Sequence, residues 1–393
     1  MLNTKFSPWP SFSQEEADKV SRVLLSNKVN YWTGQEGRDF EKEFAAWVGC
    51  DHAIALGNGT LALDLALKAL NVAVDDEVIT TPRTFLASVS SIVTAGATPV
   101  FADVDLNSQN ITAKSIEAVL TPQTKAVIVV HLAGMPAEMD AIMALSEKYG
   151  FKVIEDCAQA HGAKYKGRSV GSIGHIGAWS FCQDKIMTTG GEGGMVTTND
   201  KELWSTMWSY KDHGKSFDAI YNREHPPGFR WLHESFGTNW RMTEMQGAIG
   251  RIQLTRMLDW TAKRQSNAKA IDEAVADINV VRTVLVPDYI EHAEYKHYMF
   301  VKPENLAKGW SRDRIVDEIM ALGVPAFQGS CSEVYLEKAF DNTPWRPEVR
   351  LPNAVELGET SLMFLVHPTL TKAEIDKTCE VIRSVLLSAQ QQA

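Results

Sequence analysis

Short apolar runs alternate with helical patterns between residues 52 and 198, and this alternation is the strongest constraint on the fold. The strand-like runs lie at 52–56, 77–81, 99–104, 126–131, 152–155, 178–182 and 194–198. The helical patterns between them lie at 60–70, 84–95 and 137–149. Runs such as Ala126-Val-Ile-Val-Val-His131 lack polar alternation, which is typical of strands buried on both faces of a parallel sheet. The pattern predicts a large α/β domain with a mostly parallel, doubly wound sheet.

A second domain is expected, because 393 residues are more than one small core normally organises. Ser13 and Thr243 each begin a sequence with capping-box spacing, and the helix that Thr243 opens should continue through Leu258. The later strand and helix patterns lie at 280–286, 295–302, 311–322 and 372–387. We therefore predict a large domain over residues 1–255 and a smaller C-terminal α+β domain over residues 256–393.

Composition and charge exclude several classes of function. The net charge of −10 leaves no basic excess for phosphate contacts along a nucleic acid. No window approaches the ~18 apolar residues that a membrane-spanning helix needs, and the N-terminus lacks the apolar core of a signal peptide. The five cysteines are scattered without metal-ligand spacing, which predicts reduced thiols and no metal site. We expect a cytoplasmic protein with neither a nucleic-acid nor a membrane partner.

Two motifs at the carboxyl ends of predicted strands are candidates for ligand binding, because open α/β sheets bind ligands there. In Gly57-Asn-Gly-Thr60, glycine lets backbone N–H groups converge on an anion, and the following helix adds partial positive charge. Taken alone, the motif is equally typical of a plain turn. In Glu155-Asp-Cys-Ala-Gln159, a carboxylate ends a buried strand and needs a partner. That partner is either a structural one, such as a helix cap or ion pair, or a protonated ring nitrogen.

Lys185 follows the strand that contains Ser180, at the point where a turn begins. A lysine there is usually solvated, but partial burial would disfavour its ammonium form and yield a nucleophile. Gly190-Gly-Glu-Gly-Gly194 follows, and is either a mobile loop or a backbone that bends closely around a ligand. A phosphate cradle, a carboxylate and a lysine in this order match the needs of pyridoxal 5′-phosphate (PLP). The carboxylate of Asp156 would keep the pyridine nitrogen protonated, and Lys185 would hold the aldehyde.

With these residues in place, the chain resembles the DegT/StrS-type sugar aminotransferases, which are PLP enzymes of fold type I. The resemblance covers nearly the whole chain. It rests on Tyr31-Trp-Thr-Gly34, Gly57-Asn-Gly-Thr-Leu-Ala-Leu63, Thr81-Pro-Arg-Thr-Phe-Leu-Ala-Ser88, Val130-His-Leu-Ala-Gly134, Glu155-Asp-Cys-Ala-Gln-Ala-His-Gly-Ala163, Ser180-Phe181, Lys185, Gly191-Glu-Gly-Gly194 and Asn239-Trp-Arg-Met242. The roles it implies are Gly59, Thr60 and Ser180 for the phosphate, Phe85 for the pyridine face, Asp156 for the ring nitrogen, Gln159 for the phenolic oxygen and Lys185 for the aldehyde.

The resemblance also implies an obligate homodimer with two shared active sites. In the family, an asparagine in the position of Asn239 reaches the cofactor phosphate of the neighbouring subunit. Asn239 is therefore expected to serve the site of the partner.

The activity that the resemblance implies is PLP-dependent amination of a keto-sugar to an amino sugar, with L-glutamate as donor, in cell-surface polysaccharide biosynthesis. The acceptor would be a nucleotide-linked keto-hexose, or an oxidised octulosonate that is aminated for lipopolysaccharide. A related class replaces the lysine with histidine and dehydrates sugars, so Lys185 favours transamination. A non-catalytic PLP-fold regulator is the other alternative, and the complete set of site residues argues against it.

Two departures from the family pattern bear on the substrate. Ala133 stands where family members often carry an aromatic residue. The segment 214–237 contains three glycines, two prolines and many aromatic residues, and it reads as an unusually long loop. We expect this loop to contact the acceptor sugar through Arg230, Trp231 and His233. The alternative is that the loop only packs the dimer.

Overall fold

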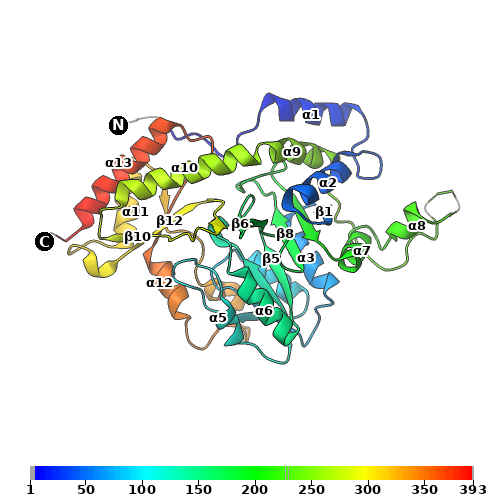
Figure 1. The fold of residues 1–393 in the computed structure, drawn as a ribbon, viewed down its shortest axis with the longest axis horizontal. Coiled ribbons are helices and arrows are strands. Elements are labelled where there is room, and N and C mark those ends of the chain that lie inside the picture. Colours follow the sequence, from blue (N-terminus) through cyan, green and yellow to red (C-terminus); the bar gives the residue numbers. More distant parts are fainter. Residues whose placement is uncertain (1–4, 226, 229, 392–393) are drawn as a thin grey trace.

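A seven-stranded sheet forms the centre of the larger part of the molecule, in a computed structural model that describes residues 5–225, 227–228 and 230–391 (Figure 1). Its strands are β1 (His52–Leu56), β2 (Glu77–Thr80), β3 (Thr98–Phe101), β4 (Thr124–Val130), β5 (Lys152–Asp156), β8 (Ile176–Ser180) and β9 (Gly194–Thr198). They are arranged in the order β1-β9-β8-β5-β4-β2-β3. All neighbours from β8 to β3 pair in parallel. The predicted mostly parallel sheet is confirmed.

Strand β9 departs from the parallel arrangement and pairs antiparallel with both β1 and β8. The described connection over residues 181–193 contains no helix, whereas a parallel neighbour needs a crossover that is usually helical. Within it, Gly190 (φ 92°) and Gly191 (φ 119°) adopt backbone conformations that favour glycine, and the chain turns back. Lys185 lies in this connection and is therefore held close to the end of β8.

Helices cover the sheet and agree in position with most of the predicted patterns. They are α1 (Gln14–Leu25), α2 (Glu36–Val48), α3 (Gly59–Ala69), α4 (Ala87–Thr94), α5 (Ala113–Glu117), α6 (Met139–Tyr149), α7 (Lys201–Tyr210) and α9 (Glu244–Thr255). Helix α9 packs against both α1 and α2 (Figure 1). Ser13 and Thr243 form the predicted capping boxes. The single helix predicted through Leu258 is wrong, because it is interrupted at Arg256, where one helix ends and the next begins, and the Arg256 guanidinium binds Glu15 and Glu16 of α1.

The C-terminal part is an α+β unit built on a four-stranded antiparallel sheet. Its strands are, in spatial order, β10 (Val281–Thr283), β12 (His297–Val301), β14 (Ser361–Phe364) and β13 (Ala326–Phe327). Its helices are α10 (Met257–Val275), α11 (Arg312–Ala321), α12 (Pro352–Thr360) and α13 (Lys372–Ala389). Helix α10 joins two hydrophobic clusters, since Met257 packs with the large sheet and Ile271 packs with the small one. The domain boundary at residues 255/256 stays a prediction.

A small third sheet fastens the C-terminal part to the large domain. It consists of β11 (Ile290–Glu291), β6 (Lys164–Tyr165) and β7 (Arg168–Ser169). Ile290 pairs with Tyr165, and beyond β11 the N–H of Tyr295 donates to the carbonyl of Ala133 (2.9 Å). Short 3-10 helices complete the fold at Leu132–Gly134, Pro303–Asn305, Val334–Leu336 and Lys338–Phe340. The third sheet thereby fixes the segment that carries Tyr295 next to the end of β4.

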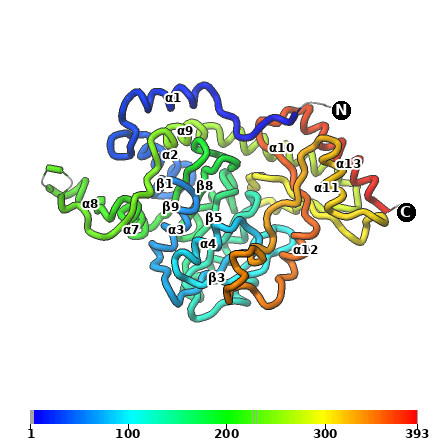
Figure 2. Tube along the Cα trace, turned by 180° about the vertical axis from the view of Figure 1, so that it is seen from behind, coloured from blue at the N-terminus to red at the C-terminus, as the bar shows by residue number. Residues whose placement is uncertain are grey.

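The segment 214–237 is more ordered than an irregular loop. It contains the short helix α8 (Phe217–Tyr221), and Phe217 packs edge-on against Trp204 and Trp208 of α7. Helix α8 lies at the edge of the molecule, far from the C-terminal part (Figure 2). Among the described residues, no helix is long and apolar enough to cross a membrane.

Candidate active site

A cavity of about 600 Å³ lies at the carboxyl ends of β4, β5 and β8. Its walls include seven of the residues that the sequence assigned to the cofactor: Gly59, Thr60, Phe85, Asp156, Gln159, Ser180 and Lys185. These residues come from separate strands and helices, and the parallel strands bring them together because their ends meet at one edge of the sheet. We call this space the cofactor cavity.

One end of the cofactor cavity is suited to an anion. Helix α3 begins at Gly59, and the side chain of Asn58 caps it by accepting a hydrogen bond from the N–H of Leu61 (3.0 Å). A Cβ on Gly59 would lie 2.5 Å from the Cβ of Ser180, so only glycine lets the helix start approach the end of β8. The first N–H groups of α3, the Thr60 hydroxyl and the Ser180 hydroxyl therefore surround a small space where a phosphate fits.

Asp156 lies on the opposite side, at the end of β5, and its side chain is almost fully buried. One carboxylate oxygen accepts a hydrogen bond from the Ser88 hydroxyl (2.8 Å), and the other accepts one from the N–H of Ala158 (3.2 Å). Burial raises the pKa of Asp156 despite these bonds and the nearby charge of Lys185. A protonated ring nitrogen would supply the cationic partner that this buried carboxylate needs, so the site fits PLP.

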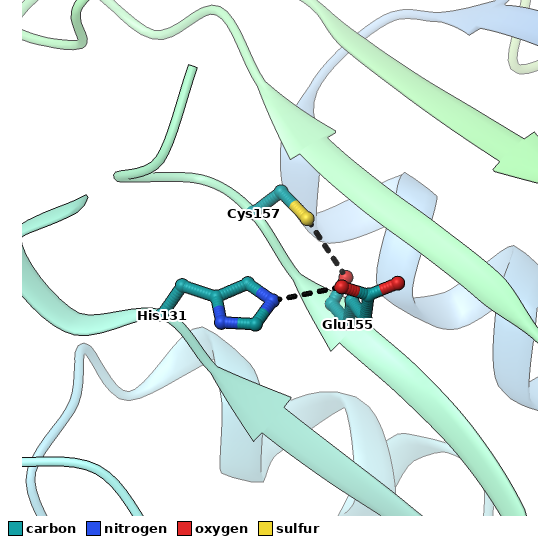
Figure 3. A group of neighbouring side chains, drawn as sticks. All are labelled: His131, Glu155 and Cys157. Atoms are coloured by element: carbon teal, nitrogen blue, oxygen red, sulfur yellow. Dashed lines mark hydrogen bonds and ion pairs between the residues drawn. The ribbon is translucent and has the colours of Figure 1, made fainter. Parts of the chain in front are cut away.

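Behind Asp156 lies a buried group with metal-ligand chemistry, His131, Glu155 and Cys157, whose side chains Figure 3 shows together. Nε2 of His131 lies 3.0 Å from Glu155, which also accepts hydrogen bonds from the N–H groups of Gly171, Ile173 and Gly174. Burial alone would raise the pKa of Glu155, but these bonds hold it below its usual range. Burial raises the pKa of the Cys157 thiol well above its ordinary value, so it stays protonated. The group is a hydrogen-bonded support for β4 and β5.

Lys185 lies between the cofactor cavity and a second cavity, with only 17% of its side chain exposed. Its Nζ is 3.7 Å from Oδ1 of Asp184 and 5.4 Å from the centre of the Tyr295 ring. The Trp9 indole donates a hydrogen bond to the backbone carbonyl of Lys185 (2.8 Å). The lysine is therefore a partly buried group that several distant segments hold in place.

Gln159 and Phe85 complete the cofactor cavity. The Gln159 carbonyl oxygen accepts a hydrogen bond from the N–H of Ala133 (2.8 Å), which leaves its NH₂ group as the donor for a cofactor oxygen. Ala133, which stands where family members often carry an aromatic residue, has φ 56°, and its carbonyl accepts a hydrogen bond from the N–H of Tyr295. The small side chain therefore lies at a close contact between two backbone segments. Phe85 is 72% exposed at the mouth, and a large exposed aromatic ring there is available for stacking.

The second cavity, of about 560 Å³, opens toward the C-terminal sheet. We call it the acceptor cavity. It shares Phe85, Gln159, Asp184 and Lys185 with the cofactor cavity, and it also includes Lys296. Burial lowers the pKa of Lys296 to about 8, although the charge of Asp184 opposes this. Sequence reasoning missed Lys296, Tyr295 and Trp9, because no local pattern marks residues that reach the site from distant segments.

Four predicted residues lie outside both cavities. Asn239 is exposed, and its side-chain oxygen accepts a long hydrogen bond from the N–H of Arg241 (3.5 Å). Arg230 is exposed, Trp231 is 83% exposed, and Nδ1 of His233 lies 2.8 Å from the carbonyl of His213. The structure does not bring them to the site of their own chain. Their roles, at the partner's phosphate for Asn239 and at the acceptor sugar for the other three, stay predictions.

The chain matches known proteins over almost its full length. Residues 10–383 match the model of the DegT/DnrJ/EryC1/StrS aminotransferase family. The chain is 35% identical over 382 residues to the spore coat polysaccharide biosynthesis protein SpsC of Bacillus subtilis (strain 168), which covers 97% of this chain and 96% of the relative. It is 35% identical over 385 residues to the GDP-perosamine synthase of Caulobacter vibrioides, with 96% and 97% covered. The crystal structure of the aminotransferase from Psychrobacter cryohalolentis is 65% identical, with a TM-score of 0.96 and coverage of 98% and 99%.

These matches confirm the fold type I class, the cofactor PLP and an aminotransferase activity, and they decide against the dehydratase and regulator alternatives. The chain therefore belongs to the DegT/DnrJ/EryC1/StrS aminotransferase family and is a PLP-dependent sugar aminotransferase.

Proposed function

We propose that this sugar aminotransferase transfers the amino group of L-glutamate to a nucleotide-linked keto-hexose, in the cytoplasm, for a cell-surface polysaccharide. The position of the Lys185 amine between the cofactor cavity and the acceptor cavity is the observation that carries the proposal. The names of two relatives, one for GDP-perosamine and one for a spore coat polysaccharide, support this acceptor class and this pathway.

The residues of the cofactor cavity divide the work by position. Bound PLP supplies a sink for the electron pair released when a carbon–hydrogen bond of the substrate breaks. Gly59, Thr60 and Ser180 would hold the phosphate, and Phe85 would cover the ring. The Asp156 carboxylate would keep the ring nitrogen protonated, because a buried charge stabilises a nearby cation strongly.

Lys185 would carry the cofactor and then move the proton. After the donor amine has displaced it, its free Nζ would accept the proton from the donor α-carbon. In the second half-reaction, the same Nζ would return a proton to the former carbonyl carbon of the sugar. Lys185 lines both cavities, so one side chain can serve both half-reactions.

Lys296 is suited to an anionic group of either substrate. It is the second lysine in the wall of the acceptor cavity, and the other described lining residues include only two carboxylates, Asp184 and Glu337. A glutamate carboxylate in the first half-reaction, or a phosphate of the nucleotide in the second, would pair with its ammonium.

A homodimer with shared active sites would explain the exposed residues that face away from the chain's own cavities. Trp231 is 83% exposed and Phe236 is 99% exposed on the projecting segment 214–237. Large exposed apolar side chains mark an interaction surface, and a second copy of this chain would cover them. In that arrangement Asn239 would reach the partner's phosphate.

The test is a two-stage absorbance experiment on the PLP-loaded enzyme. L-glutamate should convert the lysine-bound cofactor to its amino form, and keto-sugars are then screened for recovery of the original band. Recovery with a nucleotide-linked 3-keto or 4-keto hexose supports the proposal. Recovery with an oxidised octulosonate alone, or no reaction with glutamate, contradicts it. Lys185→Ala should fold and bind PLP but lose multiple turnover, and activity within about tenfold of wild type would remove Lys185 from this role.

A further inference from the structure

Asp184 immediately precedes the catalytic lysine candidate and faces both cavities. Its Oδ1 lies 3.7 Å from Nζ of Lys185, and its Oδ2 accepts a hydrogen bond from the hydroxyl of Tyr295. The Asp184 carboxylate therefore bridges Lys185 and a tyrosine that is 111 residues away from Asp184 in sequence.

Tyr295 is rigidly placed, so its hydroxyl can fix the direction of the Asp184 carboxylate. Its ring is buried, its N–H donates to the carbonyl of Ala133 (2.9 Å), and its own carbonyl accepts from Nη1 of Arg264 (3.2 Å). Ala133 in turn donates to Gln159, which lines the cofactor cavity. A continuous set of hydrogen bonds thus connects the cofactor cavity wall to Asp184.

The charges around Lys185 determine the charge state of Asp184. Lys296 is a second cation near the same point, and the charges of Arg264 and Lys185 add to burial in lowering its pKa. Burial alone would raise the pKa of Asp184, but Lys185, the Tyr295 hydroxyl and Lys296 hold it below its usual range. Asp184 is therefore an anion at neutral pH, and Lys185 and Lys296 are the cations that act on it.

The other titratable groups near this point do not replace that charge. Burial lowers the pKa of both His161 and His367 to about 3, so both imidazoles are neutral. Asp156 faces the ring-nitrogen end of the cofactor cavity, and Glu192 lines the same cavity beside Cys182. The charge of Lys185 also acts on Asp156, but among the described residues the ion pair of the Lys185 amine is with Asp184.

We propose that Asp184, oriented by the Tyr295 hydroxyl, is a positioning residue that holds the Lys185 amine between the two cavities. This inference rests on the proposed role of Lys185 as the cofactor-bearing residue. The carboxylate would keep the nitrogen that links Lys185 to the cofactor protonated near neutral pH. It would also hold the released amine beside the substrate carbon, where it must accept a proton.

The test is a pH titration of the absorbance of the PLP-loaded enzyme without substrate. Asp184→Asn should lower the midpoint by about one pH unit, the shift expected from losing a unit charge ~4 Å away in water-like surroundings. Tyr295→Phe keeps the aromatic ring but removes the hydroxyl, and it should lower the midpoint by a smaller amount. The double variant should match Asp184→Asn alone, because Tyr295 acts through Asp184. Asp184→Glu, which keeps the charge, should restore most of the wild-type midpoint.

Asp140→Asn is the matched control, because it removes a carboxylate that pairs with Lys166 and Arg168 on the surface. It should leave the midpoint unchanged, and an equal shift there would overturn the proposal. A midpoint for Asp184→Asn within about 0.2 unit of wild type, with full PLP content, would also overturn it. If Asp184→Asn does not retain PLP, the titration of Tyr295→Phe becomes the test. An unchanged midpoint in Tyr295→Phe then rejects the proposal. Persistence of the same band in Lys185→Ala would instead reject the role of Lys185.

Discussion

Replacing Asp156 with asparagine should slow the glutamate half-reaction by ~10²–10³-fold, the usual effect of losing one preorganised electrostatic partner. The structure explains why the change isolates the charge. The N–H of Ala158 can still donate to the asparagine oxygen, and the Ser88 hydroxyl can accept from the new NH₂ group. Asp156 is only 6% exposed, so solvent cannot replace the lost charge. The loss corresponds to about 3–4 kcal/mol of barrier.

The assay is a stopped-flow measurement of the loss of the lysine-bound cofactor band at saturating glutamate. Ser88→Ala is the matched control, since it removes one hydrogen bond and keeps the charge. It should cost about tenfold, the effect of ~1.5 kcal/mol from a hydrogen bond to a charged group. Thermal unfolding of the PLP-free proteins provides a second measurement. Because burial raises the pKa of Asp156, the neutral asparagine should not lower the unfolding temperature.

The reasoning is refuted if Asp156→Asn reacts at the wild-type rate. It is also refuted if this variant is no slower than Ser88→Ala and the unfolding temperature of the PLP-free protein falls. That result would make Asp156 a structural cap of the turn after β5.

Three further predictions concern the shared site, the projecting segment and the stability of the C-terminal sheet. Mixed dimers of Lys185→Ala with Asn239→Ala should give about half of wild-type turnover, because one site carries both lesions and the other neither; no recovery would mean that Asn239 serves its own chain. Alanine at both Arg230 and Trp231 should raise KM for the sugar several-fold without changing the glutamate half-reaction, and equal impairment of both half-reactions would point to dimer packing. His297 lies between two carboxylates, which raise the pKa of its imidazole to about 10 although burial opposes this. The ion pairs therefore stabilise the folded protein fully below pH ~6.5, the pKa of histidine in the unfolded chain, and this stabilisation is lost as the pH rises through about 10. Thermal unfolding from pH 7 to 10 should therefore show a larger loss of stability in wild type than in His297→Gln, and parallel curves would contradict the assignment.

Local sequence was enough to predict the part of the site that follows strand ends. Asp156 ends β5, Ser180 ends β8, and Gly59 begins the helix after β1. Buried parallel strands have a recognisable apolar pattern, and their carboxyl ends meet at one edge of the sheet, so residues at those ends converge without any knowledge of long-range contacts. The same local logic predicted the capping boxes at Ser13 and Thr243.

Local sequence did not predict the structure at two places where the chain changes direction. Strand β9 (Gly194–Thr198) continues the series of strand-like runs, but a connection without a helix makes it antiparallel to β8. The segment 214–237 looked irregular because Gly and Pro break its periodicity, yet aromatic contacts with α7 stabilise the helix α8 within it. Its exposed position, away from both cavities, could not be inferred from its aromatic content.

The surroundings of Lys185 could not be predicted from local sequence. Trp9, Tyr295 and Lys296 come from segments more than a hundred residues away, and nothing in their local pattern distinguishes them from ordinary core or surface residues. Tyr295 is held near Asp184 by the pairing of β11 with β6 and by the hydrogen bond from its N–H to the carbonyl of Ala133. Residue types at strand ends were enough to predict which side chains would hold PLP, whereas the packing of distant segments places the groups that contact Lys185, because those contacts join residues far apart in the chain.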